Sequence, residues 1–210
     1  MRPGGVGAVR LWAYPVLLAA VALGFGEAER RVQFDLWSTG LLDEASHLAT
    51  AALGLLVLAC VLDVPRRFYV AALIASVAID LDHVPDYLGL LGDQPQRPFT
   101  HSLATVAVFA GAAAASRRHR AVLAGAATGL MLHFARDIAE GPPGVRMLWP
   151  LQETAWSASY WWFLGMIVAF TAVQLVLAST NIPGERPRLF QTPSSPAHET
   201  FHMPGIRGFR

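Results

Sequence analysis

The residues of this chain that could do chemistry are histidines and aspartates placed at the ends of apolar segments. Imidazole nitrogens and carboxylate oxygens are the ligands that zinc and similar divalent metals prefer. An ionisable side chain at the edge of a hydrocarbon layer is costly, so its presence there indicates a functional site. The sequence therefore predicts a divalent-metal site, most simply for zinc. The candidates are His47, Asp80, Asp82, His83, His101, His133 and Asp137.

The run from Asp80 to Asp86 carries the densest signal. Asp80 and His83 are three residues apart, so they share one face of a helix. Asp82 faces another way unless the helix is distorted, and Pro85 gives a reason for distortion because it disfavours helix just before it. We expect Asp80 and His83 to be metal ligands and Asp82 to be a ligand or a catalytic base. The alternative is a solvated helix end.

His133 and Asp137 are four residues apart, which places them on one helix face, one turn apart. The two side chains could bind one metal together, or the carboxylate could orient the imidazole. The alternative is that His133 is a hydrogen-bonded core histidine and that Asp137 only begins a loop.

His101 follows Arg97, Pro98, Phe99 and Thr100. We expect Thr100 to be the N-cap of the next helix, with His101 in its first turn, where the helix dipole disfavours a protonated imidazole. Arg97 could bind a phosphate through paired donors. Its alternative role is that of an arginine extending to the lipid headgroups.

The remaining ionisable residues give weaker signals. His47 near the start of its segment gains weight only from lying on the same side as the others. His119 lies in a turn with three arginines and is predicted to be solvated, and Asp43 and Glu44 are predicted to be exposed loop carboxylates.

Six apolar segments have about the length that a transmembrane helix needs. The expected fold is therefore all-α, a polytopic membrane bundle of about six transmembrane helices. Residues 1–180 form this domain, and residues 181–210, which lack apolar periodicity, are expected to be a disordered tail. The segments are Leu11–Phe25, Leu42–Leu62, Phe68–Gly89, His101–Ala115, Ala121–Ile138 and Trp161–Ser179.

The first segment has a second interpretation. It follows a basic start and has a short apolar core, and Gly24, Phe25 and Gly26 resemble the small-residue cleavage site of a secretory signal peptide. A retained helix is the preferred interpretation, and cleavage is the alternative.

The placement of arginine predicts the orientation. Cytoplasmic loops carry an excess of basic residues, and Arg66, Arg67 and the Arg117–Arg120 run lie in short loops. This places both termini in the cytoplasm of an inner-membrane protein. All the candidate ligands then lie on the extracytoplasmic side, together with the aromatic residues of 149–162, as an interfacial belt would.

Composition excludes some partners. The 210-residue chain is 54% hydrophobic and 15% charged, with a formal net charge of +1. Nucleic-acid binding is not expected, because it needs clustered basic surface. The single cysteine, Cys60, excludes an intrachain disulfide.

Five elements occur in an order that resembles the YdjM family of inner-membrane metal-dependent hydrolases, over roughly residues 42–151. This family is in turn distantly similar to zinc-dependent phospholipase C. The resemblance implies that His47, Asp80, His83, His101, His133 and Asp137 are ligands. Relatives commonly have His-Arg-Gly where this chain has Gln96-Arg97-Pro98, so the number of metal ions stays open. The elements are Ser46–Thr50, Asp80–Asp86, Arg97–Leu103, His133–Asp137 and Gly144–Leu151.

The expected function is that of a membrane-bound hydrolase that uses a divalent metal, with Asp82 and Arg97 as catalytic residues. The expected substrate is a phosphoester or a phospholipid-like molecule at the outer membrane face, and membrane lipid is the expected partner. Two alternatives remain. One is an ion or proton transporter, since aspartate and histidine chains also mark such pathways. The other is a non-catalytic scaffold whose helices are joined by metal.

Overall fold

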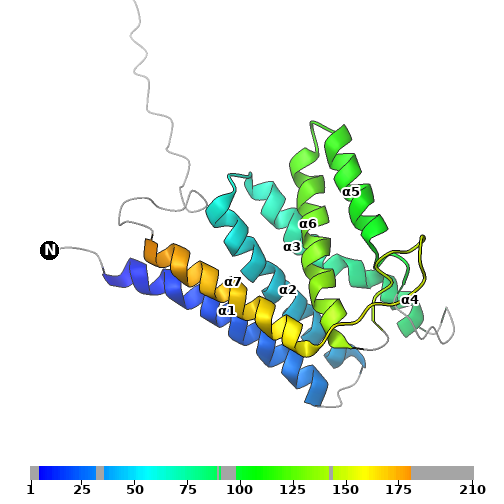
Figure 1. The fold of residues 1–210 in the computed structure, drawn as a ribbon, viewed down its shortest axis with the longest axis horizontal. Helices are drawn as coiled ribbons and strands as arrows, with labels where there is room; N and C mark the ends of the chain where they lie inside the picture. Colours follow the sequence, from blue (N-terminus) through cyan, green and yellow to red (C-terminus); the bar gives the residue numbers. More distant parts are fainter. Residues whose placement is uncertain (1–4, 32–35, 89, 91–97, 142–143, 181–210) are drawn as a thin grey trace, which may run out of the picture.

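The structure, a computed structural model, describes residues 5–31, 36–88, 90, 98–141 and 144–180, and these form an all-α fold (Figure 1). The predicted tail at 181–210 and the predicted catalytic Arg97 lie outside the described residues. The α-helices are α1 Gly5–Arg31, α2 Leu36–Val61, α3 Arg66–Ala78, α4 Val84–Tyr87, α5 Leu103–Ala115, α6 Arg120–Asp137 and α7 Tyr160–Thr180. Two 3-10 helices, η1 Ile79–His83 and η2 Ile138–Glu140, follow α3 and α6.

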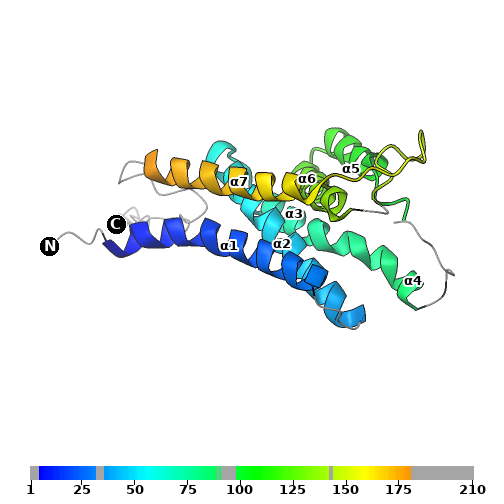
Figure 2. The ribbon, with the colours of Figure 1, turned by 60° about the horizontal axis from the view of Figure 1, so that its bottom comes forward.

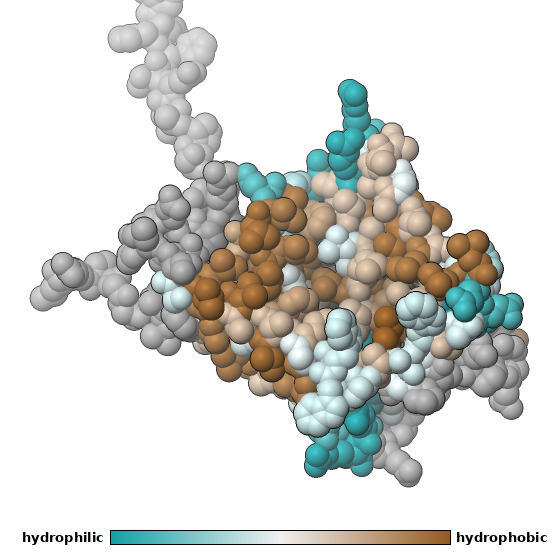
Figure 3. Space-filling model, in the orientation of Figure 1, coloured by the Kyte–Doolittle hydropathy of each residue, from teal (hydrophilic) through white to brown (hydrophobic). Residues whose placement is uncertain are grey.

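Five of the six predicted apolar segments each correspond to one helix, whereas Phe68–Gly89 is divided among α3, η1 and α4, and the membrane signal is uneven. Among the described residues, Ser38–Val61 of α2 and Tyr160–Ser179 of α7 are long and apolar enough to cross a membrane, and α5 is a shorter apolar helix. A hydrophobic surface extends over α7 and its neighbours, and hydrophilic residues gather at the turn between α5 and α6 (Figure 3). That turn exposes Arg117, Arg118 and Arg120.

Helices α3 and α6 touch backbone to backbone. A methyl group added at Gly125 would lie 2.2 Å from the carbonyl oxygen of Phe68, and one at Gly129 would lie 2.0 Å from that of Ala72. Small residues four apart let two helices approach this closely, as they do in many membrane proteins. The glycines of α6 therefore fix its register against α3.

The same register brings the candidate ligands together. One turn beyond Gly129, the His133 ring contacts the carbonyl oxygen of Ser76, at 2.8 Å. One turn further, Asp137 ends α6, while on the α3 side Asp80 lies four residues after Ser76. The contact between α3 and α6 thus determines which side chains meet at its end.

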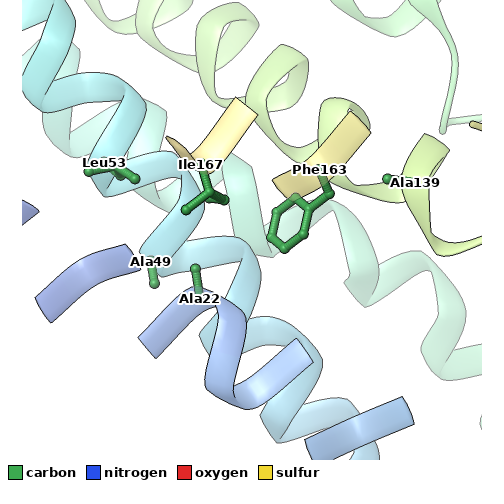
Figure 4. Close-up of a cluster of buried hydrophobic side chains, with 6 residues drawn as sticks. All are labelled: Ala22, Ala49, Leu53, Ala139, Phe163 and Ile167. Carbon is green, nitrogen blue, oxygen red and sulfur yellow. The ribbon is translucent and has the colours of Figure 1, made fainter. Parts of the chain in front are cut away.

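Helix α1 packs against α2 and α7 through a buried apolar cluster (Figure 4). Helices α1 and α7 run side by side in both ribbon views, and α4 lies at the far end of the molecule (Figure 2). The fully or almost fully buried members of the cluster are Ala22, Ala49, Leu53, Ala139, Phe163 and Ile167.

The loop between α6 and α7 holds the start of α5. Val145 pairs with Trp156 in an isolated antiparallel bridge, and the Leu103 amide donates to the carbonyl of Met147 at 2.9 Å. Gly144 has φ +77°, and a methyl group there would lie 2.5 Å from the carbonyl oxygen of Trp156, so only glycine fits. This loop therefore fixes the position of the segment that carries His101.

Candidate metal centre

The 3-10 helix η1 presents three of the candidate residues to His101. The predicted distortion is present, because the chain adopts the 3-10 form at Ile79–His83, but Val84, directly before Pro85, is α-helical. Asp80 Oδ1 lies 2.9 Å from His101 Nε2 and 3.6 Å from His83 Nε2. Asp82 Oδ2 lies 3.3 Å from the other ring nitrogen of His101, Nδ1. The distortion lets Asp82 join the cluster, which a straight helix would not allow.

The orientation of His133 indicates that a positive charge belongs beside it. Its Nδ1 lies 2.8 Å from the carbonyl oxygen of Ser76, which can only accept, so Nδ1 carries the proton. In a neutral ring Nε2 then has a lone pair. This atom is fully buried, has no hydrogen-bond partner among the described residues, and lies 3.1 Å from Asp137 Oδ2 and 3.5 Å from Asp80 Oδ1. Two anionic oxygens at these distances call for positive charge at Nε2, either from a metal ion or from a second proton on the ring.

Four atoms form a cage of suitable size for such an ion: Asp80 Oδ1, His101 Nε2, His133 Nε2 and Asp137 Oδ2. Their separations are 2.9 Å between Asp80 and His101, 3.5 Å between Asp80 and His133, 3.1 Å between His133 and Asp137, and 3.8 Å between His101 and Asp137. Tetrahedral zinc with bonds of about 2.1 Å needs ligand separations of about 3.4 Å. These four of the six separations scatter around this value, so the residues present fit a divalent ion.

All seven predicted residues that are described lie in this one cluster. Their potential ligand atoms fall into overlapping groups in which every atom is within 4.8 Å of the others. The groups are Asp80, Asp82, His83 and His101; His47, His133 and Asp137; and Asp43, His47 and Asp80.

His47 reaches the cluster from α2. Its ring stacks on that of His133, with 3.9 Å between the ring centroids, and its Nε2 lies 3.2 Å from Asp137 Oδ1. The Nη1 of Arg136 lies 2.9 Å from the same nitrogen. His47 therefore connects α2 to both acidic and basic groups of α6.

The cluster is closed on one side and open on the other. The side chains of His47, His101, His133 and Asp137 are fully buried. Those of Asp80, His83 and Asp82 are 12%, 16% and 21% exposed. Among the candidate ligands described, the exposed side chains are those of η1.

The prediction that Thr100 is the N-cap of α5 is wrong. Ser102 occupies that position, and its side chain makes no capping hydrogen bond, while His101 lies before the helix. The Thr100 hydroxyl instead donates to Asp82, and its carbonyl accepts from the Thr105 hydroxyl at 2.7 Å. Thr100 thus holds the more exposed of the two carboxylates of η1.

Sequence reasoning missed Arg136, which is 4% exposed. Its guanidinium donates to Glu29 Oε2 at 3.0 Å, to Ser46 Oγ at 2.9 Å and to Asp43. Burial raises the pKa of Glu29 above its usual value, and Arg136 opposes this effect. An arginine within an apolar helix signals such partners, because a buried charge needs neutralisation.

The expectation that Asp43 is an exposed loop residue is wrong for the same reason. It lies within α2, is 22% exposed, and contacts His47 Nε2 at 3.4 Å as well as Arg136. Glu44, in the same turn of α2, is also only partly exposed. The exposed position of His119 agrees with its predicted solvation.

Comparisons with known proteins place this arrangement in a family. Neither the curated proteins nor the solved structures that were searched contain a match. Among protein families, the one described as YdjM inner membrane protein matches residues 42–200, which include every candidate ligand from His47 to Asp137. The chain belongs to the YdjM family of inner membrane proteins.

Proposed function

We propose that this inner membrane protein is a metal-dependent hydrolase that acts on a phosphoester or phospholipid-like substrate at the outer membrane face. The observation that carries the proposal is the buried Nε2 of His133, which has a lone pair and faces two carboxylates. A divalent ion, with zinc the first candidate, removes this repulsion.

The residues divide into ligands and residues that orient them. Asp80, His101, His133 and Asp137 would be the principal ligands, with His47 and His83 beside them. The Ser76 carbonyl fixes the tautomer of His133. Outer hydrogen bonds of this kind hold a histidine ligand in the orientation that its metal needs.

Metal-assisted hydrolysis suits the open edge of the cluster. A divalent ion held there would polarise a phosphoester and lower the pKa of water toward about 7. Asp82, the most exposed of the three candidate residues in η1, would take a proton from attacking water. Arg97, in the neighbouring loop of the sequence, would neutralise a phosphate.

The proposed membrane arrangement follows from the helices. With α1 to α7 arranged as about six spans and the α5–α6 turn in the cytoplasm, the cluster lies at headgroup depth on the opposite side. A site at that depth favours an amphipathic substrate. Support comes from the inner-membrane family and from the apolar helices α2 and α7.

Elemental analysis of the detergent-purified protein tests the metal site directly. We expect about one or more equivalents of zinc or a similar metal in the wild type, and strong loss in Asp80→Ala and His133→Ala. His119→Ala is the matched control, because His119 is exposed and lies at the far end of α6. Equal loss in all three variants would contradict the assignment.

Hydrolysis needs a separate test. Vesicles that contain phospholipids with different headgroups should show turnover that stops on chelation and returns with zinc. Metal-dependent ion flux without turnover would favour the transport alternative. A metal whose removal unfolds the protein, with no turnover of any vesicle lipid, would favour the scaffold.

A further inference from the structure

Helix α1 is attached to the candidate metal centre by a chain of buried polar contacts. The Ser46 hydroxyl of α2 donates to the carbonyl of Ala22 at 2.8 Å and accepts from Arg136 Nε at 2.9 Å. Arg136 precedes the candidate ligand Asp137. One hydroxyl therefore joins α1, α2 and α6 next to the cluster.

Glu29 makes the second connection, and this one carries charge. Its carboxylate accepts from Arg136 Nη2 at 3.0 Å, while Nη1 of the same guanidinium lies 2.9 Å from His47 Nε2. Arg136 is almost fully buried, so its charge depends on Glu29 and Asp43 for neutralisation. Without the charge of Glu29, Asp43 still balances the guanidinium, but less negative charge lies beside any bound cation.

We propose that α1 is a permanent part of the metal centre and that Glu29 is a positioning residue, which acts through Arg136 to hold His47 and Asp43 beside the ligands. The proposal rests on the metal site of the proposed function but not on hydrolysis. It assigns a role to a helix that lies outside the residues matched by the family.

The packing of α1 argues against its removal as a signal peptide. Gly26, in the segment that resembles a cleavage site, is buried, and a methyl group there would lie 3.4 Å from Ser46 Oγ. Ala22, four residues earlier, is fully buried against α2 and α7 (Figure 4). Cleavage at Gly26 would separate this anchor from Glu29.

A pair of variants on the same helix tests the role of Glu29. Glu29→Gln keeps the size of the side chain and removes its charge. Glu27→Gln makes the same change at a residue that pairs only with the exposed Arg31 among the contacts described. We expect Glu29→Gln to weaken zinc affinity about 10–100-fold in a chelator competition, as loss of an outer partner does. Glu27→Gln should bind zinc as the wild type does.

Cobalt separates positioning from general loosening of the fold. Full-length protein saturated with Co²⁺ should have shifted ligand-field absorption bands in Glu29→Gln, and Glu29→Asp should partly restore the wild-type spectrum. Unchanged bands at saturation, or equal zinc affinity in Glu29→Gln and Glu27→Gln, would overturn the positioning role.

The intact mass of the protein purified from membranes tests the retention of α1. The measured mass should include the full N-terminal segment. A mass that corresponds to a chain beginning near Gly26 would overturn the proposal. The outcomes distinguish the two claims. If the wild type binds zinc more tightly than Glu29→Gln but hydrolyses no substrate, only the proposed hydrolase activity is refuted.

Discussion

Each of the three fully buried imidazoles of the cluster has a further contact, and for His133 this contact decides what its inner nitrogen can do. The Ser76 carbonyl fixes the proton of His133, Asp82 faces the outer nitrogen of His101, and Arg136 contacts His47. His133 is thereby committed to presenting a lone pair to Asp80 and Asp137, whereas the lone pair of His47 Nε2 accepts from Arg136. His133 is therefore the residue whose loss should be most informative.

Asp82→Asn separates a catalytic base from a ligand. Asparagine keeps the shape and the contact with Thr100 but accepts no proton, so we expect kcat to fall about 10²–10⁴-fold while metal content stays at the wild-type level. Paired kinetics and elemental analysis check this. If metal is lost as in His133→Ala, Asp82 is a ligand instead.

Thr100→Val tests the hydroxyl that holds Asp82. The change preserves shape and removes one hydrogen bond, which is worth about 0.5–1.5 kcal/mol. We expect kcat to fall about 10-fold or less with unchanged metal content. Thr128→Val is the control, since that hydroxyl bonds only the Ala124 carbonyl within α6 among the contacts described. An equal fall in both variants would contradict a specific role for Thr100.

Residue spacing predicted the cluster, but not all of its contacts. The four-residue spacing of His133 and Asp137, and the run that begins at Asp80, were sufficient to nominate residues that the fold does bring together. Arg136 and Asp43 were missed because they pair with each other across 93 residues of the chain, and no local sequence pattern indicates such a pairing. Thr100 was misassigned because a threonine can either cap a helix or donate its hydroxyl hydrogen to a carboxylate, and the sequence does not distinguish the two roles.

At the scale of elements, apolar length predicted the helices closely. The predicted segment Ala121–Ile138 became α6 Arg120–Asp137, and the predicted segment Trp161–Ser179 became α7 Tyr160–Thr180. Length alone did not predict how the helices pair. The contact between α3 and α6 depends on glycines of α6. Their role in close packing is recognisable only when the positions of both helix backbones are known.

Gly129→Ala tests that contact. The added methyl group would lie 2.0 Å from the Ala72 carbonyl oxygen, so the helices must separate. We expect a loss of about 1–3 kcal/mol in the free energy of unfolding, together with weaker zinc binding, because the ligands lie at the end of the same contact. Unfolding in detergent and chelator competition measure the two effects.

Gly111→Ala on α5 is the matched control. A methyl group there meets nothing within 4 Å, so its effect should be neutral or slightly stabilising. If Gly129→Ala behaves in the same way, the close approach of α3 and α6 does not determine the geometry of the cluster.

At the scale of the whole molecule, the proposed topology places the basic turn and the metal cluster on opposite sides of the membrane. In a Cys60→Ser background, His119→Cys should be protected from a membrane-impermeant maleimide in intact cells. Leu151→Cys, at a position 91% exposed on the other side, should react. Equal labelling of both positions would contradict the orientation predicted from arginine placement.

The burial of three imidazoles and Asp137 has a consequence for how the protein acquires its ion. A cation held mainly by side chains with no exposed surface leaves the site with difficulty, so its release should be slow compared with catalysis. Loading is then decided while the helices assemble, by whichever ion is abundant in that compartment. The identity of the native metal would then depend more on which ion is available during assembly than on the relative equilibrium affinities of the site for different ions.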